Sequence, residues 1–177
     1  SGGTDISLVV TKQRKDLENI IYLNSIDELN YIKENNEYIE VGATTSLRRF
    51  EQFIKKYYSD FNIILKRYGS VQIRNVATMA GNIATASPIG DSLPLLLSLD
   101  ASVIIENYSK KIIIPLNDFF VGYRKTKLKN GQFIKAIKIP KSKKNIFKAF
   151  KISKRIDDDI SSVCASFNLE IVNKKIK

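Results

Sequence analysis

The sequence has 177 residues, of which 44% are hydrophobic and 10% aromatic, as in an ordinary globular protein. It has no histidine, which excludes a Ser-His-Asp triad and a Cys-His dyad. It has one cysteine, Cys164, so this chain alone cannot form an internal disulfide framework or a cysteine-ligated iron–sulfur or zinc site. The net charge of +11 suits a nucleic-acid or anionic-surface binder, but the lysines are spread along the chain without a recognition-helix or RNA-binding signature, so we favour a lysine-rich solvated surface. In a third interpretation, some of this charge neutralises a bound phosphate ligand.

The first hundred residues predict short elements. The small-residue loop at residues 1–5 leads into an apolar, strand-like segment. The apolar spacing from Leu47 to Ile54 predicts a helix with Thr45 or Ser46 as N-cap, and residues 61–68 predict a second amphipathic helix. Strands are expected at residues 6–10, 20–23, 29–32 and 38–41, with a hairpin turn at residues 33–37.

Residues 73–94 differ from the rest, because they are rich in small and polar residues and nearly free of charge. They predict a long irregular loop, followed by a short apolar helix at residues 93–99. A weak boundary near residue 100 separates this part from a second half that alternates like β-structure. Strands are expected there at residues 102–106, 111–114, 133–139, 146–152 and 162–172, with a hairpin turn at residues 107–110.

Two separated loops can carry chemistry. In the first, Gly2 and Gly3 let the backbone approach an anion, and Thr4 adds a hydroxyl donor, although four such residues alone are more often a turn. The second, residues 78–91, combines hydroxyl and amide side chains with one carboxylate, Asp91, a set that suits sugar hydroxyls. Its alternative is an irregular surface loop. Neither loop has the Rossmann or Walker pattern, so a dinucleotide would have to bind both loops.

Two further segments leave alternatives open. Lys151 alternates with Phe150 and Ile152, and the residues alone favour a solvated strand edge followed by an acidic turn. The aromatic segment at residues 119–126, which includes Tyr123, can form one wall of a pocket, but aromatic anchors at a sheet corner are the more common case.

Taken together and in this order, these segments resemble the FAD-binding domain or subunit of the xanthine dehydrogenase family of molybdenum hydroxylases. The resemblance covers essentially the whole chain, and its variant at residues 86–91 is more similar to xanthine dehydrogenases than to carbon monoxide dehydrogenase relatives. It implies an α+β fold with two lobes that clasp FAD, truncated at both ends. The lobes would be residues 1–100, without the strand and helix before Gly2, and residues 101–177, with an antiparallel sheet whose end is incomplete. The matching segments are residues 1–5, 72–91, 119–126, 137–140 and 151–160.

The resemblance also implies a site. Asp91 would bind a sugar hydroxyl, and Ile134 and Lys151 would border the isoalloxazine. Lys151, Asp158 on a mobile loop and Tyr123 on the nicotinamide side are the candidates for a role in the reaction, and no metal ligand is expected. The cofactor-binding residues implied are Ser1, Gly2, Gly3, Thr4, Asp5, Ile6, Tyr68, Ala77, Thr78, Gly81, Asn82, Thr85, Asp91, Ile134 and Lys151.

The function implied by the resemblance is an electron relay during hydroxylation of a purine or another N-heterocycle. A molybdenum-cofactor subunit and a 2Fe-2S domain or subunit would be the partners, and electrons would pass through FAD to NAD+. We expect a cytoplasmic oxidoreductase component without a membrane or nucleic-acid partner. The alternatives are a non-catalytic basic binding module and an assembly subunit that keeps only the fold; the intact Gly81, Asn82 and Asp91 argue against the second.

Overall fold

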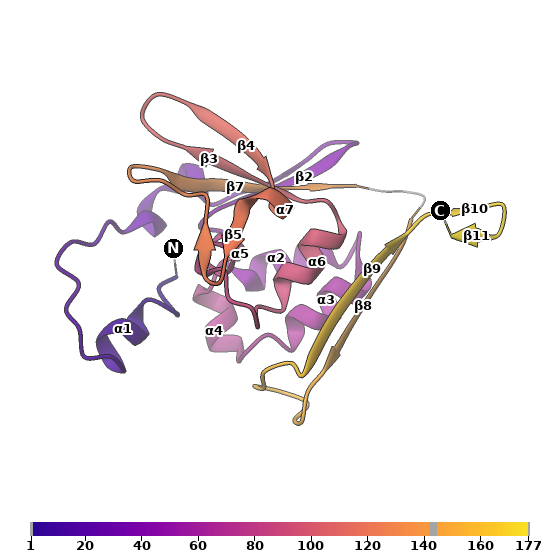
Figure 1. Ribbon diagram of the computed structural model, residues 1–177, viewed down its shortest axis with the longest axis horizontal. Helices are drawn as coiled ribbons and strands as arrows, with labels where there is room; N and C mark the ends of the chain where they lie inside the picture. Colours follow the sequence, from indigo (N-terminus) through magenta and orange to yellow (C-terminus); the bar gives the residue numbers. More distant parts are fainter. Residues whose placement is uncertain (1, 142–144, 177) are drawn as a thin grey trace.

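The structure is a computed structural model, and it describes residues 2–141 and 145–176. A five-stranded sheet covers a layer of helices, and a separate two-stranded hairpin lies along the other side of that layer (Figure 1). The expected α+β class is therefore confirmed. Among the described residues, no helix combines the length and the apolar character needed to cross a lipid bilayer.

The sheet is antiparallel and takes strands from both sides of residue 100. Val41 lies opposite Ile137, and Ile137 lies opposite Val103, so three adjacent strands direct branched apolar side chains toward the helices. Burial of such a row is the main source of stability for the sheet. Its strand order is β1 (Ile32–Glu34), β2 (Tyr38–Gly42), β7 (Phe133–Pro140), β3 (Ser102–Glu106) and β4 (Lys111–Pro115).

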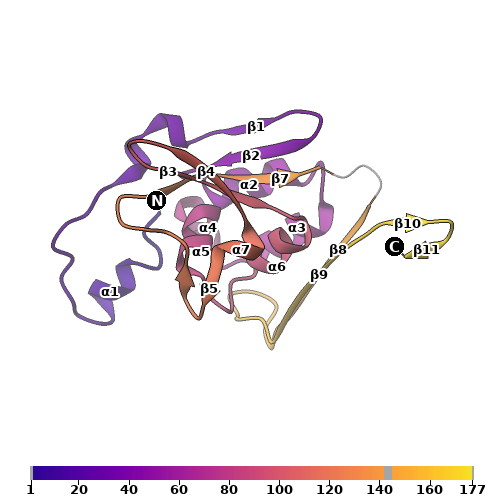
Figure 2. The same cartoon turned by 45° about the horizontal axis from the view of Figure 1, so that its top comes forward.

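The helices pack under this sheet, as the tilted view shows (Figure 2). The first of them begins as expected at Ser46, whose side chain accepts a hydrogen bond from the Arg49 amide at 3.2 Å. Its Phe50 ring meets Phe61 edge to face at 5.6 Å. The helices are α2 (Leu47–Ile54), α3 (Ser59–Lys66), α4 (Val71–Val76), α5 (Met79–Thr85), α6 (Ser92–Ser98) and α7 (Leu116–Phe119).

The hairpin of β8 (Ile146–Ile152) and β9 (Val163–Leu169) packs on α3 and α6. Phe147 lies against Tyr58 and Phe61, with ring centroids 5.1 and 6.2 Å away. Because side chains alternate along a strand, Lys151 points inward while Phe150 and Ile152 are exposed. The interpretation of Lys151 as part of a solvated edge is therefore wrong.

The largest error of the sequence prediction concerns residues 73–94, most of which belong to helices α4, α5 and α6, whereas residues 86–91 are irregular as expected. Ser70 and Thr78 cap α4 and α5 by accepting hydrogen bonds from the amides of Ile73 and Gly81. The alanines of this stretch are good helix formers, and their small side chains let α5 pack closely through Met79 and Ile83.

Of the strands expected before residue 42, the one at residues 38–41 is confirmed as part of β2, and the other three are wrong in whole or in part. Residues 6–10 belong to a helix, α1 (Ser7–Thr11), which satisfies its backbone internally and buries no side chain. Residues 20–22 form no strand, and Ile20 and Ile21 are exposed. The strand expected at residues 29–32 begins only at Ile32, after two short 3-10 helices, η1 (Leu23–Ser25) and η2 (Asp27–Leu29).

In the second half, the strands predicted from residue 102 to residue 152 are confirmed to within one residue. The strand expected at residues 162–172 is interrupted after Leu169, because the chain turns into a small separate hairpin. The remaining strands are β5 (Phe120–Gly122), β6 (Lys125–Thr126), β10 (Ile171–Val172) and β11 (Lys175–Ile176).

Candidate functional site

A cavity of about 730 Å³ lies where four distant parts of the chain meet. Its walls are the N-terminal loop at residues 2–6, the turn at Tyr68 and Gly69, helix α5 with the segment that follows it, and the tip of the β8–β9 hairpin. The volume falls in the range of about 300 to 1,000 Å³ that is typical of small-molecule and cofactor sites. The two loops singled out in the sequence therefore face one another across a shared space.

The N-terminal loop approaches α4 so closely that a side chain would not fit. A Cβ added to Gly2 would lie 1.7 Å from the carbonyl oxygen of Val76. Gly3 has φ +72°, a left-handed conformation that other residues adopt only with strain. Asp5 reaches across the cavity, where the Thr85 hydroxyl donates to its carboxylate at 3.4 Å. Glycine at both positions lets bare backbone face the cavity.

Helix α5 supplies the polar groups of the second wall. The Asn82 amide nitrogen donates to the Tyr68 hydroxyl at 2.9 Å, and the Asn82 carbonyl accepts from Ser92. Burial, and then the charges of Asp91 and Asp5, raise the pKa of Tyr68 to about 12. This hydroxyl stays protonated at neutral pH, so it can donate a hydrogen bond while it accepts one from Asn82.

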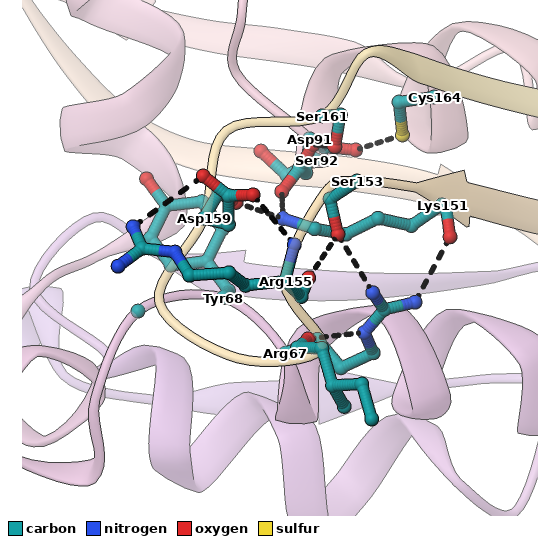
Figure 3. Close-up of polar contacts among 12 residues, drawn as sticks. Arg67, Tyr68, Asp91, Ser92, Lys151, Ser153, Arg155, Asp159, Ser161 and Cys164 are labelled. Atoms are coloured by element: carbon teal, nitrogen blue, oxygen red, sulfur yellow. Dashed lines mark hydrogen bonds and ion pairs between the residues drawn. The ribbon is translucent and has the colours of Figure 1, made fainter.

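A buried ion pair between Asp91 and Lys151 joins the small-residue segment to the hairpin (Figure 3). Asp91 is 6% exposed and Lys151 is 9% exposed, and both line the cavity. Lys151 also donates to the carbonyl of Asp159 at 2.9 Å, while Ser161 donates to the other carboxylate oxygen of Asp91. Two charges taken out of water require such compensation, since an unpaired buried charge is costly.

Cys164 lies behind this pair, and its thiol donates to the main-chain oxygen of Asp91 at 3.5 Å (Figure 3). Burial, helped by the nearby Asp91 charge, raises the pKa of the thiol to about 11. The thiol is therefore protonated at neutral pH and is a poor nucleophile. It serves as packing for the ion pair.

The hairpin tip is anchored by arginines. The Arg67 guanidinium donates to the carbonyls of Lys151 and Ile156 and to the Ser153 hydroxyl, each at 2.9 Å (Figure 3). Arg155 donates from its backbone amide to the Asp159 carboxylate at 2.9 Å, which lowers the pKa of that carboxyl. These contacts hold the residues between β8 and β9 against the cavity.

The structure brings most of the predicted residues together but separates a few. Ile134 is buried in β7, packs in the core and does not line the cavity. Tyr123 is 76% exposed in the turn between β5 and β6, outside the cavity lining. Ser1 lies outside the described residues. The predicted residues that line the cavity are Gly2, Gly3, Thr4, Asp5, Ile6, Tyr68, Ala77, Thr78, Gly81, Asn82, Thr85, Asp91, Lys151 and Asp158.

Sequence reasoning missed several residues of the site. Ser92 and Ser161 complete the hydrogen bonding of Asn82 and Asp91, yet nothing in their local sequence signals such distant partners. Gly90 stood next to the predicted Asp91, and a neighbouring glycine was the one available signal. Further lining residues that were not predicted are Val9, Gly69, Ile73, Ala84, Ser87, Ile89, Gly90, Asp159 and Ile160.

Comparison with known proteins identifies relatives of this arrangement. The family described as "FAD binding domain in molybdopterin dehydrogenase" matches residues 1–142. The chain is 34% identical over 183 residues to xanthine dehydrogenase of Emericella nidulans, covering 96% of this chain and 13% of that protein. It is 31% identical over 124 residues to the nicotinate dehydrogenase FAD-subunit of Eubacterium barkeri, covering 69% of this chain and 42% of that one.

Solved structures show the same fold. Carbon monoxide dehydrogenase from Hydrogenophaga pseudoflava superposes with a TM-score of 0.92 at 20% identity, over 100% of this chain and 62% of that chain. The two-loop cavity thus occurs in a fold shared with that protein, and the family match extends over both loops and the whole five-stranded sheet. The chain belongs to the family of FAD-binding domains of molybdopterin dehydrogenases.

Proposed function

We propose that this chain binds FAD in the 730 Å³ cavity and acts as the flavin electron-transfer module of a xanthine-dehydrogenase-like molybdenum hydroxylase. The observation that carries the proposal is that residues 2–6, helix α5, Asp91 and Lys151 line one cavity. The family match supplies the identity of the cofactor. The two expected lobes, divided near residue 100, remain part of the proposal; the shared sheet would join them.

The residues present fit FAD. The first wall is a cradle that a Cβ would fill, because Gly2 approaches Val76 and Gly3 has a positive φ. Such bare backbone can donate amide hydrogens to a pyrophosphate. The hydroxyls of Thr4 and Thr78 add donors of the same kind around the cavity, which Thr85 also lines.

The carboxylate of Asp91 retains capacity for a ligand. Its two oxygens each accept one hydrogen bond, from Lys151 and from Ser161, and a carboxylate has about four acceptor positions. A ribityl or ribose hydroxyl can therefore donate to Asp91 without breaking the ion pair. In this proposal Ala77, Gly81 and Asn82 complete the second cradle, and Ser1 and Ile6 complete the first.

When bound, FAD would allow the site to take up electrons one at a time and to give up two of them together as a hydride. Lys151 would place a cation at the ring, since its contacts with Asp91 and Asp159 use two of three N–H groups among the described contacts. Tyr68, kept protonated, would pack against the cofactor as a neutral wall. Asp158, with φ +49°, lines the cavity and would contribute on the side from which nicotinamide approaches. Ile134 and the exposed Tyr123 do not line the cavity, so they would border only a part of the ring that extends beyond it.

The relatives support a proposal for the partners and the substrate. Two of them are named for xanthine and nicotinate, which are N-heterocycles. We therefore infer that a molybdenum-cofactor subunit hydroxylates a purine or a related heterocycle, that 2Fe-2S clusters deliver the electrons to FAD, and that NAD+ receives them. A cytoplasmic location is part of the same proposal.

The direct test is an absorbance spectrum of the purified chain, followed by release and identification of any cofactor and titration with FAD. We expect flavin absorbance, and we expect Asn82→Ala to weaken FAD binding, because Asn82 joins Tyr68 to Ser92. Asn117→Ala, an exposed position in α7, is the matched control. A colourless chain that refuses added FAD but binds nucleic acid in a salt-sensitive way would favour the basic binding module instead.

A further inference from the structure

A second buried ion pair lies behind the cavity wall rather than in it. Glu51 of α2 is 2% exposed and Arg74 of α4 is 6% exposed, and the Arg74 Nε lies 3.2 Å from a carboxylate oxygen of Glu51. Neither residue lines the cavity.

The other end of the Arg74 guanidinium reaches the wall itself. Its Nη1 donates to the carbonyl of Gly69 at 2.6 Å and to that of Tyr68 at 3.3 Å, and both residues line the cavity. Gly69 has φ +53° and turns the chain from α3 into α4. One planar side chain therefore connects helix α2 to the turn that carries Tyr68.

Glu51 is itself held on two sides. Arg48 donates to its other carboxylate oxygen at 2.9 Å, and the buried Asn62 side chain donates to its main-chain oxygen at 2.7 Å. The carboxylate is thus a fixed point against which the guanidinium is oriented.

A buried ion pair is weak evidence for stability, because desolvation offsets much of the attraction between the charges. The pair does fix the position of the Tyr68–Gly69 turn relative to helix α2. Tyr68 meets Asn82 at 2.9 Å, and Asn82 continues to Ser92, so the position of the turn sets the position of a whole wall.

We propose that Glu51 and Arg74 are a positioning pair, which fixes the Tyr68–Gly69 turn so that Tyr68 and Asn82 present the correct wall to the cofactor. This inference rests on the proposed FAD binding and adds two residues that act on the site without touching it. A lysine at position 74 would keep the charge but would not bridge a carboxylate and two carbonyls at once.

The test separates positioning from folding with a double variant, Glu51→Leu together with Arg74→Met. Replacing both charges by apolar groups removes the uncompensated charge that either single change would leave, so the urea unfolding midpoint should stay near that of the wild type. The Kd for FAD should rise by at least about tenfold, because displacement of a positioned group by about 1 Å costs binding and rate. Arg74→Lys should show the same loss of FAD affinity. Arg49→Ala removes an exposed side chain of the same helix, which contacts Asn30 rather than Glu51, and should leave FAD affinity unchanged.

A second readout needs no cofactor. The alkaline spectroscopic titration of Tyr68, obtained by subtracting the matching Tyr68→Phe protein, should move to lower pH in the double variant and in Arg74→Lys. Burial is the largest cause of the raised pKa, and a turn that is no longer held in place exposes the hydroxyl to water, which outweighs the loss of the Asn82 hydrogen bond that lowers the pKa. A double variant that binds FAD like the wild type and keeps the Tyr68 titration would overturn the inference.

If the wild-type chain itself refuses FAD, the proposed function fails, and the Tyr68 titration alone decides whether the pair positions the turn: an unchanged titration rejects it. If the double variant does not fold, Arg74→Lys decides by the same two measurements.

Discussion

At the scale of single residues, the site depends on charges and hydroxyls that are buried only because they have partners. Asp91 is the clearest example, since it binds Lys151 and Ser161 from the far end of the chain while its main chain accepts from Cys164. Its sequence neighbours explain none of these contacts. A single substitution at Asp91 should therefore lower the stability of the fold as well as the affinity for a ligand.

Asp91→Asn should lower the free energy of unfolding by roughly 3 kcal/mol, because Lys151 would stay buried without its counter-charge. Urea unfolding followed by circular dichroism measures this. Adding Lys151→Met should recover most of the loss. A single Asp91→Asn variant that is as stable as the wild type would contradict the ion pair.

Tyr68 predicts an alkaline dependence of stability. Folding raises the pKa of this acid from its ordinary value of 10.0 to about 12, so the native state favours the protonated form. Its contribution is fully present below pH 10 and is lost as the pH rises through about 12. Cys164, whose pKa burial raises to about 11, and Tyr31, whose pKa is also raised, contribute to the same loss.

Tyr68→Phe should therefore make the fall in unfolding free energy above pH 10 shallower without abolishing it. Denaturant unfolding at a series of alkaline pH values measures the slope. Tyr108→Phe, at a fully exposed position, is the control and should leave the slope as it is. Equal slopes in wild type and Tyr68→Phe would show that Tyr68 titrates normally.

At the scale of elements, helix α5 is short, and its start decides where Gly81 and Asn82 lie. The Thr78 hydroxyl accepts the Gly81 amide at 3.0 Å. A cap of this kind matters more in a helix of 7 residues than in a long one, because a short helix has few internal hydrogen bonds.

Thr78→Ala should lower the unfolding free energy by about 1 kcal/mol and should also weaken FAD binding, because the first turn of α5 would fray. Thr78→Ser keeps the hydroxyl and should retain most of both properties. Chemical denaturation and FAD titration of the two variants provide the comparison. Equal FAD affinity in Thr78→Ala and the wild type would show that the cap does not define this wall.

At the scale of the molecule, the site exists because the β8–β9 hairpin docks on the helices. Phe147 lies against Tyr58 and Phe61, and this contact holds the strand that places Lys151 at the cavity. On the opposite face of the same hairpin, Phe150 is exposed and contacts Phe167 of the neighbouring strand. The two phenylalanines offer a matched pair of positions on one strand.

Phe147→Ala should cost roughly 3 kcal/mol and should lower FAD affinity, because the hairpin loses its contact with α3. Phe150→Ala should cost less and should leave FAD affinity nearly unchanged. Hydrogen exchange of the β8 and β9 amides reports docking directly. Similar effects of the two substitutions would mean that the hairpin is held mainly by other contacts.

The resemblance to a known family implied the α+β class. The sequence by itself determined the strands from residue 102 to residue 152, a helix capped by Thr45 or Ser46 and the two segments that form most of the cavity. Each of these depends on local periodicity, on a cap or on a motif of small residues, which a single chain displays. The helices α4 and α5 within residues 73–94 were not predicted, because small polar residues are weak helix signals until the caps and the close packing are known. Only the tertiary structure placed Lys151 inside, joined Asp91 to Ser161 and set Arg74 between Glu51 and the Tyr68 turn. Lys151 and Asp91 are 60 residues apart in the sequence, Ser161 and Asp91 are 70 apart, and Arg74 and Glu51 are 23 apart. Contacts over such separations depend on how the elements pack, and the neighbouring residues in the sequence do not determine them.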